Sequence, residues 1–180
     1  MKARERNRSR VLVVDGYNVL NALGPPLELG GSLADARDAL ADRLEDYAGF
    51  SGQRVVLVFD AWLSDRKQRS QEDRGALTVV FTRKGETADH YIERFCDDCA
   101  QAVNDGRMEL RVATSDNVEQ TVVFGRGAVR ISARELLFEL EGARRIRQEH
   151  GAVGGRAGGT LADRLPEDVR RRLEEMRRGQ

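Results

Sequence analysis

The stretch Val11-Leu-Val-Val-Asp-Gly-Tyr-Asn18 decides the fold of this chain. Four apolar residues in a row, ended by an aspartate and a glycine, are typical of a strand that is buried on both faces of a parallel sheet. Gly16 is expected to let the backbone turn sharply where this strand ends. Residues 54–60, Arg-Val-Val-Leu-Val-Phe-Asp, repeat the pattern. Between the two strands, residues 32–48 carry apolar side chains at helical spacing behind a capping serine, so we expect a helix there.

The alternation of strands and helices continues to about residue 150. Further strands are expected over 76–82, 109–114 and 128–131, and further helices over 86–104, 116–124 and 132–149. The polar stretch 61–75 predicts an exposed loop or a short helix. This order of elements implies right-handed crossovers and an α/β fold of three layers, in which helices cover both faces of a central, mainly parallel sheet.

The two ends of the chain differ from this region in composition. We expect a basic tail over 1–10, the domain proper over 11–150, a glycine-rich linker over 151–165 and a tethered basic helix over 166–180. Acidic residues outnumber basic ones only in the middle, over 11–125. Basic flanks around an acidic centre suit an enzyme that binds phosphates at its edges and cations in its middle, and solubility with chance explains the pattern equally well.

Several functional classes are disfavoured by the sequence. No apolar run is long enough to cross a bilayer and no secretory signal follows the basic start, so we expect a cytoplasmic protein of bacterial type, or one of an organelle stroma. Neither a dinucleotide-binding G-x-G-x-x-G nor a phosphate-binding GK[ST] loop is present. Cys96 and Cys99 have the spacing of half a zinc site, but they fall in the middle of an expected helix. We therefore expect Cys99 to pack in the core and Cys96 to be exposed.

Four aspartates are expected at the edge where the parallel strands end, which is where open α/β sheets bind ligands. They are Asp15 and Asp60 at the ends of the first two strands, Asp116 after the fourth strand, and Asp89 in the helix after the third. Like charges this close cannot all stay ionised without a cation, and oxygen ligands suit Mg²⁺ or Mn²⁺. Each aspartate alone has a structural explanation as a helix cap or first-turn residue. Asp15 is the hardest to explain in that way, because it directly follows buried residues.

A set of ordered motifs resembles a known family. The motifs are Val14-Asp-Gly-Tyr-Asn18, Val58-Phe-Asp-Ala61, Glu86-Thr-Ala-Asp89, Ala113-Thr-Ser-Asp116, Phe124-Gly-Arg-Gly-Ala128 and Ser132-Ala-Arg-Glu-Leu136. In order and spacing, over roughly residues 11–150, they resemble the YacP branch of the NYN-domain nucleases, which belong to the PIN-like ribonuclease superfamily. The resemblance implies a PIN-like fold and a Mg²⁺-dependent endoribonuclease that hydrolyses single-stranded RNA.

The resemblance also implies site residues and partners. Matched by motif, the catalytic centre would comprise Asp15, Asn18, Asp89 and Asp116, and the three aspartates would hold one or two ions. Asp60 either binds an ion or supports a residue that does. An activated water would attack the phosphorus in line and leave a 5′-phosphate and a 3′-hydroxyl. Bacterial members of the YacP type act on messenger RNA at the ribosome, so both are expected partners, whereas a membrane is not.

Basic residues away from the aspartates are candidates for binding RNA. Arg66, Lys67 and Arg69 follow the strand that ends in Asp60, where they could bind phosphates or form an exposed charged loop. Arg171 and Arg172 lie in the basic last helix, which suits either ribosomal RNA or solvent.

Two other functions remain open on the sequence alone. One is a module that binds RNA or the ribosome without cutting, and weak metal binding with no effect of mutating Asp89 would favour it. The other is a different metal-dependent phosphohydrolase, or a nuclease of DNA, built on the same acidic edge. Competition between RNA, DNA and small phosphate esters would separate these possibilities.

Overall fold

A computed structural model describes residues 8–24, 31–61, 68–114 and 127–155 of the chain, with the backbone alone for residues 150–155. The chain divides into two units, Met1–Ala143 and Arg144–Gln180. The described part of the second unit is the end of one helix, so the fold below is that of the first unit.

One sheet organises the first unit. Its strands are β1 (Ser9–Asp15), β2 (Arg54–Phe59), β3 (Ser70–Arg74), β4 (Leu77–Phe81), β5 (Met108–Ala113) and β6 (Val129–Ile131). They lie in the order β3-β4-β2-β1-β5-β6, and every neighbouring pair is parallel except β3 with β4. The mainly parallel sheet expected from the sequence is confirmed, and its central strand is the one that ends in Asp15.

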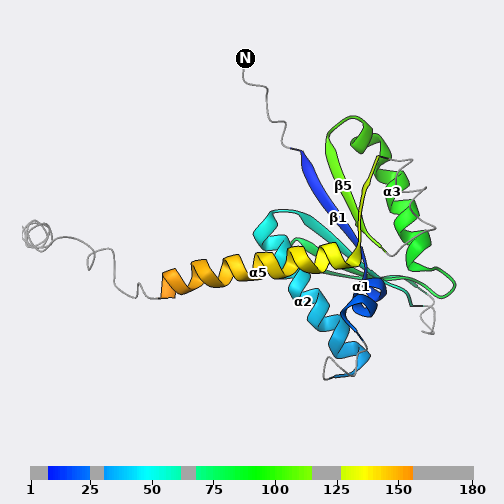
Figure 1. The fold of residues 1–180 in the computed structure, drawn as a ribbon. Coiled ribbons are helices and arrows are strands. Elements are labelled where there is room, and N and C mark those ends of the chain that lie inside the picture. Colours follow the sequence, from blue (N-terminus) through cyan, green and yellow to red (C-terminus); the bar gives the residue numbers. More distant parts are fainter. Residues whose placement is uncertain (1–7, 25–30, 62–67, 115–126, 156–180) are drawn as a thin grey trace, which may run out of the picture. The chain divides into compact units, whose positions relative to one another are not determined.

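Helices cover both faces of this sheet (Figure 1). The helices are α1 (Gly16–Leu23), α2 (Leu33–Ser51), α3 (Ala88–Asn104) and α5 (Ala133–Gly155). Successive side chains of a strand point to opposite faces. In β1, Leu12 and Val14 therefore join a core with α1, α2 and the start of α5, whereas Val11 and Val13 join a second core with α3. The resulting three layers are those expected from the sequence.

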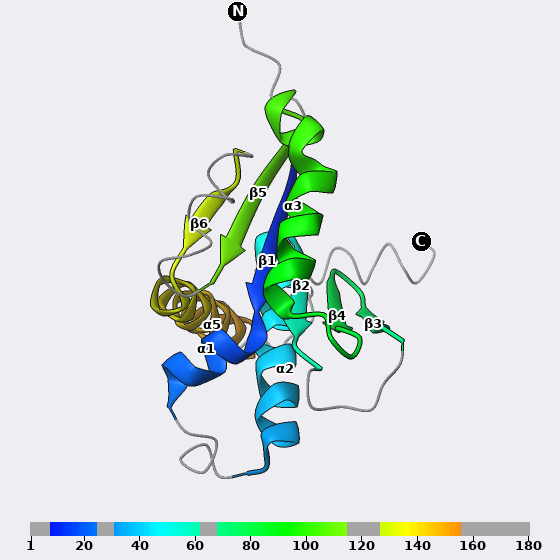
Figure 2. The same ribbon diagram turned by 90° about the vertical axis from the view of Figure 1, so that its right-hand side faces the viewer.

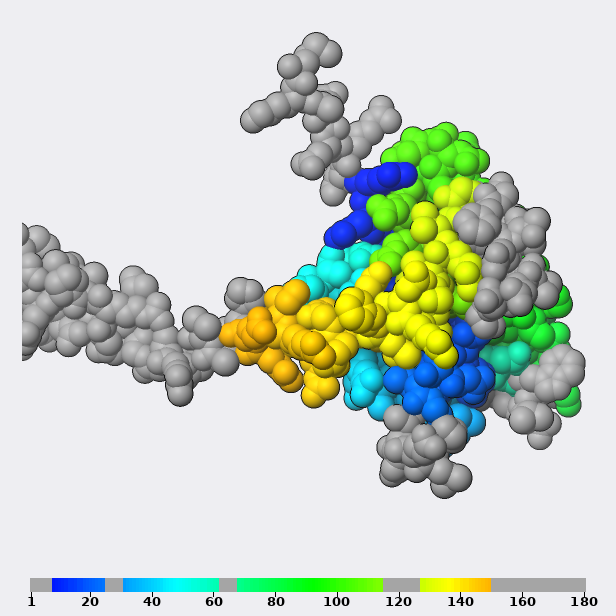
Figure 3. All heavy atoms as spheres, in the orientation of Figure 1, coloured from blue at the N-terminus to red at the C-terminus, as the bar shows by residue number. Residues whose placement is uncertain are grey.

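The face opposite α3 is covered by α1, α2 and the start of α5. α1 and α2 contact each other as well as the sheet, and their side chains form a continuous surface in the space-filling view (Figure 3). α2 begins with the expected cap, since the Ser32 hydroxyl accepts a hydrogen bond from the backbone N–H of Asp35 and the Asp35 carboxylate accepts one from that of Ser32. α5 begins with the same reciprocal arrangement between Ser132 and Glu135.

The stretch predicted as a loop or short helix is in part a strand, so that prediction is wrong for residues 70–74. β3 and β4 form an antiparallel hairpin around Gly75, which has a φ of 59°. β3 lies at an edge of the sheet (Figure 2), and its central residues are exposed. An exposed polar edge strand lacks the apolar alternation by which strands are recognised in a sequence, which explains the error.

The prediction for the two cysteines is wrong for Cys96, whereas Cys99 packs against the core as expected. Cys96 is fully buried and Cys99 only partly, because the buried stripe of α3 runs through Ile92, Cys96 and Val103. The apolar residues of α3 permit two stripes that differ by a small rotation, and only packing against the sheet selects one of them.

Some predictions concern the ends of elements or residues outside the described ranges. α5 continues to Gly155 and so includes the first residues of the predicted linker. The expected helices over 116–124 and 166–180 lie outside the described residues. None of the described helices is long and apolar enough to cross a membrane.

Candidate active site

Asp15 joins the central strand to the helix that follows it. It is the last residue of β1 and the N-cap of α1, where its Oδ1 accepts a hydrogen bond from the backbone N–H of Asn18 at 3.1 Å. The carboxylate is therefore held at the carboxyl edge of the sheet, with no loop between the two elements. Asn18 lies in the first turn of α1, beside Asp15, and is partly buried.

Gly16 is required at this junction for a reason that differs from the expected turn. It begins α1 directly and is not among the glycines with positive φ. Instead, a Cβ at this position would lie 2.3 Å from Cε1 of Phe59, which is far inside van der Waals contact. The glycine allows the buried Phe59 ring of β2 to pack against the start of α1, which keeps the ends of β1 and β2 together.

Three of the four predicted aspartates share the carboxyl edge of the sheet. Asp60 directly follows β2, whose Val58 is paired with Asp15 in the neighbouring strand. Asp89 is exposed in the first turn of α3, which is capped by Thr87 through a hydrogen bond of 3.2 Å to the backbone N–H of His90. Next to Asp60, the backbone N–H of Ala61 donates to Oγ1 of the buried Thr82 at 3.0 Å, which joins the end of β2 to the residue after β4.

The electrostatics of Asp15 link these aspartates to one another. Burial, as the largest cause, raises the pKa of Asp15 from 3.8 to about 6. The hydrogen bond from Asn18 acts against this shift, and the negative charges of Asp89 and then Asp60 add to it. The ionised form of Asp15 is thus disfavoured both by desolvation and by its acidic neighbours, and a bound cation would offset both effects.

The donor atoms at this edge fit a divalent cation in their chemistry. They are carboxylate oxygens, which are the ligands that Mg²⁺ and Mn²⁺ prefer, and they include a partly buried group whose pKa is raised. Within the described ranges, no three His, Cys, Asp or Glu side chains are arranged to hold a metal ion. Asp116 follows β5 in the sequence, and it lies outside the described residues.

The predicted RNA-binding residues are mostly in parts of the chain that are not described. Arg66, Lys67, Arg171 and Arg172 lie outside the described residues. Arg69 is described, and its Nε donates to Oε2 of Glu86 at 3.3 Å while its Nη2 contacts Oε1. Its guanidinium also lies over the Tyr91 ring, 4.7 Å from the ring centroid.

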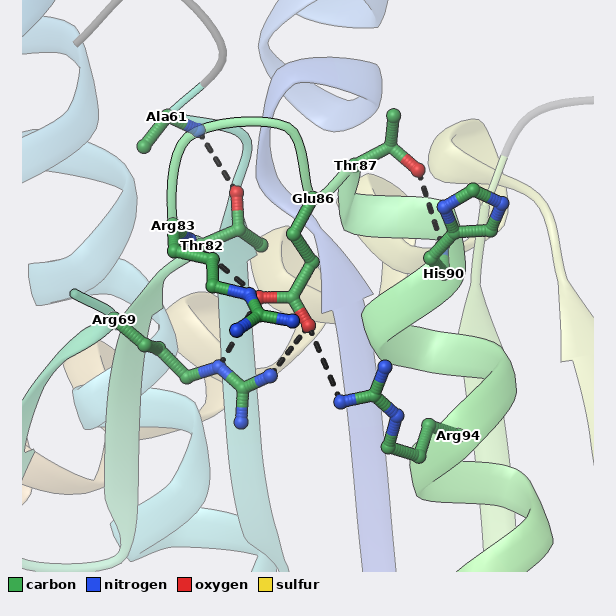
Figure 4. Close-up of polar contacts among 8 residues, drawn as sticks. All are labelled: Ala61, Arg69, Thr82, Arg83, Glu86, Thr87, His90 and Arg94. Carbon is green, nitrogen blue, oxygen red and sulfur yellow. Dashed lines mark hydrogen bonds and ion pairs between the residues drawn. The ribbon is translucent and has the colours of Figure 1, made fainter. Parts of the chain in front are cut away.

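Sequence reasoning missed the role of Glu86, which entered only as the first letter of a motif. This side chain is 4% exposed and is surrounded by Arg69, Arg83 and Arg94, as Figure 4 shows. Burial acts to raise the pKa of Glu86, but the hydrogen bonds from Arg69 and from the backbone of Arg83 outweigh it and lower that pKa. The arginines come from three separate segments, so no local signal in the sequence could have identified the cluster.

Comparisons with known proteins agree with this architecture. The sequence model of the YacP-like NYN domain matches residues 12–178. YacP of Bacillus subtilis, an uncharacterised protein, is 40% identical over 172 residues, which cover 94% of this chain and 97% of that protein. The crystal structure of Rae1 (YacP) from B. subtilis superimposes with a TM-score of 0.63 at 39% identity, covering 94% of this chain and 95% of that one. The crystal structure of a mutant of the same B. subtilis protein gives a TM-score of 0.63 at 35% identity, over 93% and 99% of the two chains.

The NYN/PIN-like fold is that of nucleases, which are hydrolases that generally depend on a divalent metal ion. The Asp15 and Asp60 carboxylates of this chain lie at the carboxyl ends of parallel strands, the edge at which open α/β sheets bind ligands. Because the matches extend over almost the whole of this chain and almost the whole of each relative, the chain belongs to the YacP-like NYN-domain family.

Proposed function

We propose that this protein is a Mg²⁺- or Mn²⁺-dependent endoribonuclease that hydrolyses phosphodiester bonds of single-stranded RNA, and that its substrate is messenger RNA on the translating ribosome. The observation that carries the proposal is the state of Asp15, a partly buried strand-end carboxylate whose pKa is raised by burial and by Asp89 and Asp60. Strong perturbation of a carboxylate at the ligand-binding edge of an α/β sheet is typical of an active site.

The residues at the acidic edge would have different roles in hydrolysis. Asp15, Asp89 and Asp116 would hold the ion, with Asp60 as a further ligand or as support for the others. A bound divalent ion lowers the pKa of a water molecule and neutralises charge on the phosphate during hydrolysis. The backbone N–H of Asn18 orients the Asp15 carboxylate, and the Asn18 side-chain amide would orient a water or a phosphate without adding charge.

The basic residues would hold the substrate. Arg69 directly precedes Ser70, which is paired with the last residue of β4 at the carboxyl edge of the sheet, and Arg66 and Lys67 precede it in the chain. These three residues would bind phosphates beside the aspartates. Arg171 and Arg172 would bind ribosomal RNA through the basic C-terminal segment.

The test is cleavage of labelled messenger RNA in Mg²⁺, with and without translating ribosomes. We expect the wild type to cut, and EDTA or Asp89→Asn to abolish cutting. The matched control is Asp98→Asn, which makes the same change at an exposed aspartate further along α3. Cutting only in the presence of ribosomes would support the ribosomal substrate, and equal cutting of free RNA would contradict that part of the proposal.

Other outcomes would point to the other two functions. If wild type and Asp89→Asn leave RNA equally intact in every condition but bind it, the protein is a binding module and the catalytic proposal is wrong. If DNA or a small phosphate ester competes with RNA and is hydrolysed faster, the reaction is that of a different metal-dependent phosphohydrolase.

A further inference from the structure

A basic hollow lies next to the acidic edge and takes no part in the arrangement of the aspartates. It has a volume of about 370 Å³ and is lined by Gln68, Arg69, Arg83 and Arg94. Arg69 and Arg83, which flank β3 and β4, line one side of the hollow, and Arg94 of α3 lines the other (Figure 4). Gln68, Arg83 and Arg94 are all exposed, so the hollow is open to solvent.

Glu86 holds two of the arginine side chains and one arginine backbone in place. Its carboxylate takes two donors of Arg69 and lies 3.5 Å from Nη1 of Arg94, and the backbone N–H of Arg83 donates to it at 3.5 Å. The Arg69 guanidinium is fixed a second time by the Tyr91 ring. One buried carboxylate therefore organises the guanidinium groups of Arg69 and Arg94 and the backbone of Arg83, and the cluster keeps an excess of positive charge.

Donors remain for a ligand after Glu86 is satisfied. Arg69 still has Nη1, and Arg94 still has Nε and Nη2, since a guanidinium carries five N–H donors. Among the residues that the structure describes, the Arg83 guanidinium has no recorded hydrogen-bond or ion-pair partner. Figure 4 shows the Arg69 and Arg94 side chains directed toward Glu86, and these two arginines line the same hollow as Arg83.

The position of the hollow links it to the aspartates. Arg83 follows the end of β4 at the same edge at which Asp15 and Asp60 end their strands. Glu86 precedes the cap of α3, the helix whose first turn carries Asp89. A nucleic acid strand at the aspartates would thus meet a positive site at the same edge of the sheet as the negative one.

We propose that this hollow binds a backbone phosphate of the RNA strand, next to the phosphate at which cutting occurs. The inference rests on the proposed nuclease function and adds a subsite to it. Guanidinium groups suit phosphate because their planar donors match its oxygens. Because the Arg69 guanidinium lies over the Tyr91 ring, that face of the ring offers no stacking surface to a base, and the subsite holds the strand without reading its sequence.

The decisive variant is Arg83→Gln, because the Arg83 side chain is not a recorded partner of Glu86. Binding of a short labelled single-stranded RNA is measured in EDTA, so that no cutting occurs, across a range of salt concentrations. We expect the affinity for RNA to fall roughly tenfold, because the variant loses one charge-assisted hydrogen-bonding group. The slope of log K against log salt should shrink by about 0.7, the value for one phosphate contact on a single strand.

A second arginine variant and a matched control test whether the effect is specific to the hollow. Arg94→Gln should act in the same direction as Arg83→Gln, and the two should weaken binding for A-rich and U-rich strands alike. Arg54→Gln is the matched control, because it removes the same charge at the start of β2, on the opposite edge of the sheet. It should leave both affinity and slope unchanged. Thermal unfolding of each variant checks that the fold is retained.

A comparison of strands with and without a 5′-phosphate distinguishes an internal phosphate from a terminal one. Equal affinity of the wild type for both supports the backbone assignment. That assignment would be overturned if the wild type prefers the strand with a 5′-phosphate and Arg83→Gln does not. It would also be overturned if millimolar inorganic phosphate displaces the RNA from the wild type but not from Arg83→Gln.

The subsite and the nuclease function fail in different ways. If Asp89→Asn abolishes cutting but a folded Arg83→Gln matches the wild type in affinity and slope, the subsite is wrong and the nuclease function stands. If neither the wild type nor any variant cuts RNA but RNA binding still depends on Arg83, the phosphate site stands and the nuclease function is wrong.

Discussion

The Oδ1 atom of Asp15 lies 3.1 Å from the backbone N of Asn18, so a single carboxylate caps α1 and faces the acidic edge. Only one of the two roles depends on the charge. The cap needs only an oxygen that accepts a hydrogen bond, whereas metal binding needs a full negative charge. Substitutions at Asp15 should therefore separate stability from activity.

Asp15→Asn should abolish cutting and yet stabilise the metal-free protein. Asparagine is as good a cap as aspartate, and it has no charge to desolvate. Because the folded-state pKa of Asp15 is raised to about 6, its ionised form destabilises the fold at neutral pH. We expect a gain on the order of 1–2 kcal/mol at pH 7 in EDTA. Denaturant unfolding measures it, and a loss of stability in Asp15→Asn would contradict the account.

Divalent metal should stabilise the wild type against unfolding, and it should not stabilise Asp15→Asn. Saturating Mg²⁺ at about 100 times its dissociation constant adds about 2.7 kcal/mol to a protein that binds it only when folded. The thermal midpoint is compared in Mg²⁺ and in EDTA for the wild type, Asp15→Asn and Asp98→Asn. The wild type and Asp98→Asn should respond alike. An equal response of Asp15→Asn would show that the ion binds elsewhere.

Gly16→Ala should destabilise the protein by about 1–3 kcal/mol, because the added methyl group overlaps the Phe59 ring. Gly49→Ala is the matched control in α2, where a Cβ meets nothing within 4 Å. That change should stabilise the helix by up to about 1 kcal/mol. Chemical denaturation of both variants tests the pair. Partial rescue of Gly16→Ala by Phe59→Leu would identify the ring as the cause.

Stability should depend on pH through Glu139. The side chain of Arg111 in β5 donates to it, as does the Tyr47 hydroxyl at 2.8 Å, and the bond from Arg111 is the largest cause that lowers the pKa of Glu139. A lowered folded-state pKa stabilises the fold above the ordinary value of 4.5, and this contribution is lost as pH falls through the folded value.

The variant that tests this dependence is Glu139→Gln. Its deficit in unfolding free energy should be on the order of 1 kcal/mol at pH 7, since the group is partly exposed. The deficit should shrink as pH is lowered from about 5 toward about 3, the range in which an ordinary or lowered carboxyl pKa falls. A deficit that stays constant over that range would show that the ionised carboxylate is not the source of the stabilisation.

Much of this architecture follows from local patterns. The apolar run before Asp15 and the serine caps of α2 and α5 are signals contained within a few residues, and the structure agrees with each of them. Parallel strands end at a common edge, so the shared location of Asp15 and Asp60 followed from topology alone.

The features that were missed depend on contacts between distant residues. β3 is a strand because β4 pairs with it, and Cys96 is buried because the sheet selects that side of α3. Glu86 gathers arginines from a strand-flanking segment, a turn and a helix. No window of sequence contains those partners together, so their arrangement emerges only once the chain is folded.

The direct passage from β1 into α1 also determines which changes in chain length the protein can tolerate. An extra residue between Asp15 and Gly16 would rotate the helix by about 100°, the angle per residue at about 3.6 residues per turn, and would pull the cap away from its partner. Insertions at that junction should therefore be excluded from functional relatives. Variation in length is expected instead at the tip of the β3–β4 hairpin, where Gly75 and Ala76 are exposed.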